Sequence, residues 1–293
     1  MKKTFRESIQ NKEFVITAEL NLARESDASA VIDQAAILSP RVDAIQVPDS
    51  PGGRVQMTPL TVSNILIQNG IDPIAHLSCR DRNRVALGSE LLSLGATGVT
   101  SVLLLRGDEL PGDHRPKVRQ VFELGGMKLI ETARALADDP TVASVPDFCI
   151  GTTATVFNPK AAWQPNSLLA RVEAGARFIQ TQLCFDTAAL GRYMTHLVEA
   201  QLTWRTAIIV SLATMPSAVT ARWLRENVRG SRVPKKVIRR LEQARDPEQE
   251  GVAICAELLQ ELSAIPGVSG ANLMTPGDPA TIPAAIQASG LRS

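Results

Sequence analysis

Short apolar runs alternate with longer segments of helical periodicity along these 293 residues, and this alternation restricts the folds open to the chain. Runs such as FVITAEL, SVLLLRG and AIIVSLA are rich in branched aliphatic residues on both faces. Such runs are typical of parallel strands that are covered on both sides. We predict strands at Phe14–Leu20, Asp43–Asp49, Pro73–Cys79, Ser101–Asp108, Asp147–Ala154, Phe178–Gln182, Ala207–Ala213 and Gly267–Thr275.

The segments between these strands carry apolar residues at helical spacing, and Asp27 or Ser26 is a suitable N-cap for the first of them. Eight strands alternating with helices predict a (β/α)8 TIM barrel, an α/β fold. An open doubly wound sheet is the alternative, but no GxGxxG motif follows the first strand. The predicted helices are Asp27–Leu38, Thr58–Gln68, Asn83–Leu94, Met127–Ala137, Ser167–Ala174, Ala188–Ala200 and Ala218–Asn227.

We expect residues 1–293 to form a single barrel domain, because no linker rich in Gly, Ser or Pro interrupts the pattern. The most charged stretch, RVPKKVIRRLEQARDPE, precedes the last predicted strand. It predicts a short solvated helical insertion around residues 231–248.

The charge balance restricts the kinds of partner that we expect the chain to bind. Lys and Arg number 31 against 30 Asp and Glu, so the net charge of +1 argues against nucleic acid or an anionic membrane as a partner. No apolar run approaches the roughly 20 residues that span a bilayer. The amino terminus has no apolar core behind its lysines, and the four cysteines form no CxxC pair. We therefore expect a reduced, cytoplasmic protein.

Polar residues lie late in five of the otherwise apolar strands. In a barrel, the carboxyl ends of all strands meet at one mouth, where active sites lie. A buried carboxylate is costly unless it is paired or functional. Taken singly, Asp49 and Asp108 are compatible with helix caps and His76 with a satisfied core histidine. The residues that converge are Glu19, Asp49, His76, Arg106, Gly107, Asp108 and Gln182.

Other chemistries receive less support from the sequence. His76 is the only histidine in a predicted strand, so we expect no metal site. A serine hydrolase is disfavoured because no GxSxG elbow occurs. Cys79 lies close to His76, but the two side chains would point to opposite faces of the strand, which disfavours a thiol nucleophile.

Several of these segments resemble the methylenetetrahydrofolate reductase family, in its bacterial form that consists of the catalytic domain. The segments are VITAEL with Glu19, AHLSCRDRNR, LLLRGD, AGARFIQTQLCFD, WLRENVRGSRVPKKVIRRLE and IPGVSGANLMTPGD. The resemblance runs from about residue 12 to the end of the chain. It implies a (β/α)8 barrel that binds FAD.

The resemblance also implies a reaction. Hydride passes from NAD(P)H to FAD, and then to 5,10-methylenetetrahydrofolate, which becomes 5-methyltetrahydrofolate. Glu19 stands at the position of the family's acid, which protonates N10. Asp108 matches the aspartate close to flavin and folate, and Gln182 matches the glutamine that contacts the pterin.

For the cofactor, the resemblance implies FAD contacts from several strand ends and from the helix segment LLARVEAGA. Two departures from the family pattern concern these contacts. Pro48 replaces a threonine, and the fifth-strand region lacks a tyrosine and acidic residues. Phe157 and Trp163 are then available to stack on the adenine, and the alternative for each is a surface or core role. The implied FAD-contacting residues are Asp49, His76, Arg106, Gly107, Asp108 and Arg171.

Alternative functions stay open. One is a relative that works in the oxidative direction or without bound flavin, and another is a folate- or flavin-binding subunit of a larger complex. A homo-oligomer or a partner subunit is compatible with each of them.

Overall fold

The computed structural model describes residues 3–11, 13–110, 117–142 and 147–292. Within these residues, eight strands pair in sequence order, all in parallel, and the first pairs with the last to close a barrel. The strands are β1 Val15–Glu19, β2 Ala44–Val47, β3 Pro73–Ser78, β4 Ser101–Leu105, β5 Cys149–Ala154, β6 Ala176–Thr181, β7 Ala207–Ala213 and β8 Gly270–Met274. The predicted TIM barrel is confirmed.

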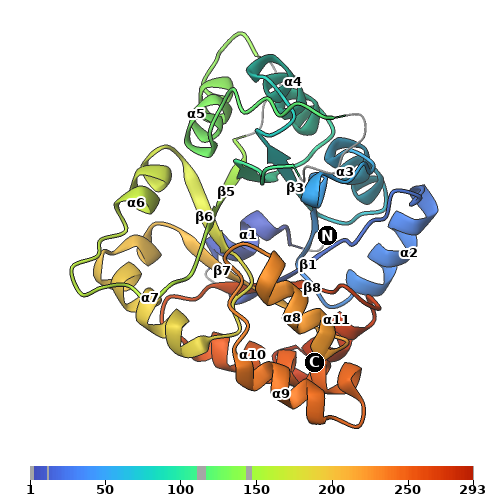
Figure 1. Cartoon of the computed structure of the whole chain (residues 1–293). Coiled ribbons are helices and arrows are strands. Elements are labelled where there is room, and N and C mark those ends of the chain that lie inside the picture. Colours follow the sequence, from blue (N-terminus) through green and yellow to red (C-terminus); the bar gives the residue numbers. More distant parts are fainter. Residues whose placement is uncertain (1–2, 12, 111–116, 143–146, 293) are drawn as a thin grey trace.

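Helices surround the barrel (Figure 1). Seven of them lie where apolar periodicity predicted helices, and the Asp27 side chain caps the first of these by accepting from the Ala30 N–H. The sequence did not predict α1, α10 and α11. The helices are α1 Phe5–Gln10, α2 Ala28–Leu38, α3 Pro59–Gln68, α4 Arg84–Ala96, α5 Gly126–Ala137, α6 Asn166–Glu173, α7 Thr187–Glu199, α8 Ala218–Asn227, α9 Lys235–Gln243, α10 Pro247–Ala264 and α11 Thr281–Ser289.

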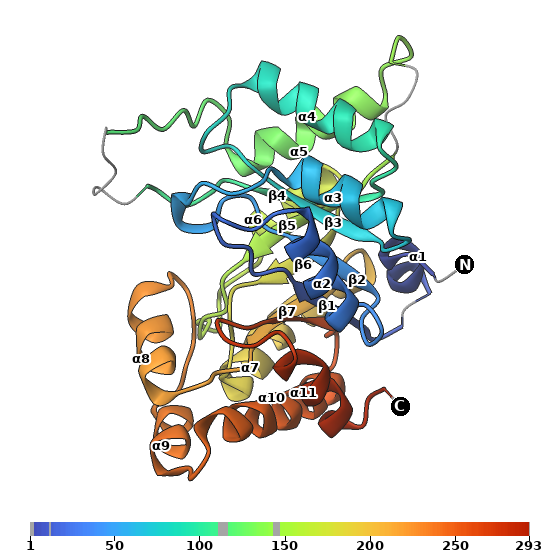
Figure 2. The ribbon, with the colours of Figure 1, turned by 90° about the vertical axis from the view of Figure 1, so that its right-hand side faces the viewer.

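The α1 helix covers the amino-terminal end of the barrel, opposite the end where α8 lies (Figure 2). Its Phe5 ring is fully buried and meets the Phe178 ring edge-on at 5.0 Å. The Phe5 N–H donates to Asp72 Oδ2 at 2.7 Å, which ties α1 to the segment before β3. The layer of the barrel interior that lies at this end is apolar. The apolar layer consists of Phe5, Val15, Ala44, Ile74, Leu103, Cys149, Phe178 and Ile209.

The charged segment before the last strand forms α9 and the start of α10. One face of α9 is buried in the main core through Val237, Ile238 and Leu241. On its other side, Arg240 pairs with Glu250 and Glu257 of α10, at 2.6 Å each. The charged residues therefore belong to a packed pair of helices, of which only the outer face is solvated. Across the described part of the chain, every helix is too short or too polar to be a membrane span.

Candidate functional site

The middle of the barrel interior is polar, in contrast to the apolar layer beneath it. Gln46 on β2 lies at the centre, where its Nε2 donates to Thr17 Oγ1 at 2.9 Å and to Gln180 Oε1 at 2.6 Å. The Thr17 hydroxyl donates to Asn272 Oδ1 at 2.9 Å. All these side chains are buried. The sequence analysis missed this network, whose signal is a polar residue at an alternate position of an otherwise apolar strand.

His76 belongs to the same network. Its Nε2 lies 2.8 Å from Gln46 Oε1. Burial lowers the pKa of His76 to about 4, against an opposing effect of the Asp49 charge, so the imidazole is neutral at pH 7. Because the amide nitrogen of Gln46 donates both of its hydrogens, its oxygen accepts from the protonated Nε2 of His76. One ring nitrogen of His76 therefore has a partner within the protein.

Glu19 is the last residue of β1, at the carboxyl end of the barrel, and is partly buried. Burial raises the pKa of Glu19 to about 7, and hydrogen bonding to the Asn272 side chain opposes this rise. A carboxyl group with a pKa near the working pH both gives and takes a proton readily. The arrangement is therefore suited to general acid chemistry.

Asp49 follows β2 and is held by the protein. Its carboxylate accepts from Arg82 at 2.7 and 3.2 Å and from the Ser78 N–H at 2.8 Å. The Asp49 side chain is only 1% exposed. Asp49 therefore joins the ends of β2 and β3, and Arg82 is a residue of this site that the sequence analysis missed.

The residues after β4 have different environments. The Arg106 guanidinium lies 4.2 Å from the centre of the Phe122 ring and is otherwise exposed. Gly107 has φ +83°, and a Cβ at this position would lie 3.0 Å from the Arg80 Cβ, so a larger residue would disturb the contact between the ends of β3 and β4. Asp108 is exposed, and it makes no hydrogen bond or ion pair with the residues that the structure describes.

Arg171 and Gln182 lie at the ends of β5 and β6. Arg171, on α6, is partly buried and donates to the Thr153 carbonyl at 2.7 Å. Its burial lowers the pKa of Arg171, and no acidic residue of the described ranges pairs with it. Gln182 follows β6, and its Cγ would lie 3.4 Å from a Cβ placed on Gly230 in the segment after α8.

Phe157 and Trp163, in the segment between β5 and α6, pack against α7. The Phe157 ring lies 5.0 Å from Trp163 and 5.4 Å from Tyr193, and Trp163 stacks on Tyr193 at 5.4 Å. Both rings therefore have partners within the protein. This is the packing role that the sequence analysis weighed against stacking on an adenine.

Closure of the parallel barrel brings the carboxyl ends of all strands to one mouth. Glu19 ends β1 there, and Asp108 and Gln182 follow β4 and β6, but no hydrogen bond among the described residues joins any two of them. Asp49 and His76, in contrast, are held by protein partners in the wall beside and beneath the mouth.

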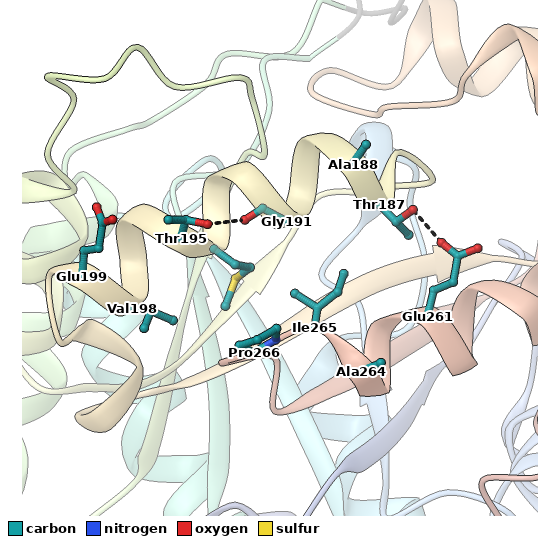
Figure 3. Close-up of a pocket in the computed structure, with 11 residues that line it drawn as sticks. Thr187, Ala188, Gly191, Thr195, Val198, Glu199, Glu261, Ala264, Ile265 and Pro266 are labelled. Atoms are coloured by element: carbon teal, nitrogen blue, oxygen red, sulfur yellow. Dashed lines mark hydrogen bonds between the residues drawn. The ribbon is translucent and has the colours of Figure 1, made fainter.

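A separate pocket of about 730 Å³ lies on the outside of the barrel, between α7 and the end of α10 (Figure 3). Its walls are mostly apolar, and Thr187 on α7 donates to Glu261 on α10 at 2.6 Å across it. None of the site residues predicted from the sequence lines this pocket. It is therefore distinct from the barrel mouth.

The raised pKa of Glu19 predicts a pH-dependent stability. Between pH 4.5 and about 7 the folded protein binds this proton more tightly than the unfolded chain does. The contribution of Glu19 to the free energy of unfolding is therefore fully present below pH 4.5 and is lost as the pH rises through 7. The loss amounts to about 3 kcal/mol at most. Denaturant unfolding of wild type and Glu19→Gln across this range should show the glutamine variant gaining relative stability as the pH rises. A constant difference would contradict the burial of a titrating Glu19.

Known proteins of similar sequence have been identified. The 5,10-methylenetetrahydrofolate reductase of Salmonella typhimurium is 27% identical over 173 residues, covering 58% of this chain and 53% of that protein. The enzyme of Escherichia coli is 26% identical over the same length, with the same coverage. The matched region thus spans about half the length of these relatives.

Solved structures share the fold at low sequence identity. An uncharacterized protein from Clostridium thermocellum, which binds two copies of 5-methyl-5,6,7,8-tetrahydrofolic acid, has a TM-score of 0.63 at 13% identity, with 97% of each chain covered. The EDTA monooxygenase of Chelativorans has a TM-score of 0.56 at 11% identity, over 94% of this chain and 92% of that one. The family model described as methylenetetrahydrofolate reductase matches residues 4–289. This chain therefore belongs to the methylenetetrahydrofolate reductase family.

Proposed function

We propose that this protein reduces 5,10-methylenetetrahydrofolate to 5-methyltetrahydrofolate, with FAD as cofactor and NAD(P)H as hydride donor. Membership of the family supports the reaction class. The observation that carries the assignment to this site is Glu19, a carboxyl group at the barrel mouth whose pKa burial raises to about 7. It is the acid that the folate half of the reaction requires.

Glu19 protonates N10 of the folate in this proposal. The five-membered ring then opens to a cationic iminium, which accepts the hydride. An ordinary glutamate would be almost fully ionised at pH 7 and a poor donor, whereas the raised pKa of Glu19 favours its protonated form. Burial of this side chain is thus the cause of the raised pKa that suits it to act as the acid.

Asp108 and Gln182 bind the substrate. The Asp108 carboxylate is exposed at the mouth and has no partner in the described ranges, so its charge is available to stabilise the iminium cation. The Gln182 amide both donates and accepts, as recognition of a pterin edge requires, and it adds no charge. No other role in the fold engages either group in the residues that the structure describes.

When bound, FAD would take hydride from NAD(P)H and deliver it to the folate. The chain fits the anionic part of this cofactor, because Arg171 is a partly buried guanidinium that no described acidic side chain neutralises. A phosphate is a suitable partner for such a group. Arg106 and Asp108 are exposed at the barrel mouth, where they would contact the cofactor. Asp49, His76 and Gly107 would form the wall of the cofactor site.

Titration of purified protein with FAD tests the cofactor. We expect saturable binding at micromolar FAD, and Arg171→Gln should weaken it by about 10-fold or more through loss of the charged bond to phosphate. Arg177→Gln is the matched control, since Arg177 is an exposed arginine near the amino-terminal end of β6. Equal affinity of the Arg171 variant and wild type would reject the phosphate contact.

The flavin-free alternative has one observation in its favour, which is the packing of Phe157 and Trp163 on Tyr193. Two measurements on wild type separate the possibilities. Formation of 5-methyltetrahydrofolate from NADH or NADPH only when FAD is bound supports the proposal, and the same turnover without FAD supports the alternative. No turnover under either condition would favour a binding subunit.

A further inference from the structure

Asn272, on β8, lies one inward-facing position below the level of Glu19 on the neighbouring strand β1. Its partner in the register of β8 with β1 is Thr17, and Glu19 is the next inward-facing residue of β1 toward the mouth. Asn272 is 0% exposed. Asn272 lies in the segment IPGVSGANLMTPGD, but the family resemblance assigned no role to it.

The hydrogen-bond network determines which way the Asn272 amide points. Because Thr17 Oγ1 accepts from Gln46, its own hydrogen is free to donate to Asn272 Oδ1. The amide oxygen of Asn272 therefore faces Thr17. Its nitrogen, on the other side of the same planar group, is left to act as a donor elsewhere.

That donor is only weakly used in the resting protein. Asn272 Nδ2 is buried and makes no hydrogen bond of normal geometry with the described residues, although an unpaired buried N–H costs free energy. Among the influences on the pKa of Glu19, the Asn272 side chain is the one that lowers it and so favours the ionised form. Hydrogen bonds to a carboxylate are shorter and stronger than those to a neutral acid. A hydrogen bond from the Asn272 N–H to Glu19 is therefore strongest when Glu19 is ionised.

We propose that Asn272 is a positioning residue, which the Thr17–Gln46 hydrogen bonds orient so that it stabilises the Glu19 carboxylate formed by proton donation. The inference rests on the proposed role of Glu19 as the acid. The lone pair of N10 takes the proton, the electrons of the O–H bond remain on Glu19, and the Asn272 N–H donates to the new carboxylate.

Other titratable groups near this end of the barrel do not explain the behaviour of Glu19. His76 on β3, Asp49 after β2 and Asp108 after β4 are not among the causes of its altered pKa. Burial and Asn272 are the two influences on it. The coupling can therefore be measured through the titration of Glu19 alone.

The first test uses the resting protein and needs no folate. Protein labelled with δ-¹³C glutamate is titrated by NMR, and Glu19→Gln identifies the Glu19 resonance. We expect Asn272→Leu to raise the pKa of Glu19 by about one unit, as loss of a charge-assisted bond should. Thr17→Val should shift it in the same direction by less, because it removes only the group that orients the amide. Ser211→Ala is the matched control, since Ser211 flanks Asn272 on β7 and its buried hydroxyl has no hydrogen-bond partner in the described residues.

The second test follows the two half-reactions across pH. Asn272→Leu should slow folate reduction about 10-fold or more and move its decline at alkaline pH upward, with flavin reduction by NAD(P)H unchanged. If the pKa of Glu19 is unchanged in Asn272→Leu, the inference is overturned, whatever the activity. If Asn272→Leu does not fold, the pKa of Glu19 in Thr17→Val decides in the same way. A shifted pKa in a protein whose wild type does not reduce folate would uphold the Asn272–Glu19 coupling and reject the proposed reaction instead.

Discussion

Glu19→Gln is expected to slow the reduction of 5,10-methylenetetrahydrofolate by at least about 10²-fold, because glutamine cannot supply the proton that N10 requires. It keeps the size of the side chain and most of its hydrogen bonding. Hydride transfer from NAD(P)H to the flavin needs no such proton, so that half-reaction should remain nearly at the wild-type rate. Stopped-flow measurement of the two half-reactions separates these effects.

A matched control for this variant is Glu13→Gln. Glu13 precedes β1 at the opposite end of the barrel and is an exposed carboxylate that pairs with Lys3. Its replacement should change neither half-reaction. Equal slowing of both half-reactions by Glu19→Gln, or no slowing of the folate step, would show that Glu19 is not the proton donor.

Gly251→Ala is expected to destabilise the fold by about 3 kcal/mol, the upper part of the range for overpacking a core. Gly251 lies in α10, and a Cβ there would lie 2.0 Å from the Met215 carbonyl oxygen. Met215 follows β7, so α10 would have to move away from the barrel. Because backbone atoms form this contact, no side-chain rotation can relieve it.

Gly191→Ala provides the comparison. Gly191 lies within α7, and a Cβ there would meet nothing within 4 Å. Alanine should stabilise that helix by roughly 0.5–1 kcal/mol through its better helix propensity. Both free energies of unfolding can be measured in urea. A Gly251→Ala protein as stable as wild type would contradict the close packing of α10 on the end of β7.

The strands were predictable from the sequence because parallel strands buried on both faces need continuous apolar runs. The same rule explains why the sequence did not predict the helix α10. Residues 252–256 (VAICA) are all apolar, and α10 buries residues on much of its circumference, so no helical periodicity marks the segment. Its neighbour α9 has a clear apolar face, but the many charges around that face favoured a solvated helix.

The chain order of polar residues, together with barrel closure, was sufficient to place Glu19, Asp108 and Gln182 at one mouth, since the carboxyl ends of parallel strands meet there. The sequence did not show which polar groups are already engaged. The Asp49 carboxylate is bound by Arg82, and the Thr17 hydroxyl donates to Asn272, 255 residues away. Such pairs depend on strand register and on the closing contact of β1 with β8.

The sequence by itself thus determined the strand order, the barrel and the residue types at its mouth, because local apolar runs and their spacing encode these features. Only the tertiary structure decided the protonation states there. Burial within the closed barrel raises the pKa of Glu19 to about 7 and lowers the pKa of His76 to about 4. Desolvation and hydrogen-bond direction arise from all the strands together, so no local stretch of sequence specifies them.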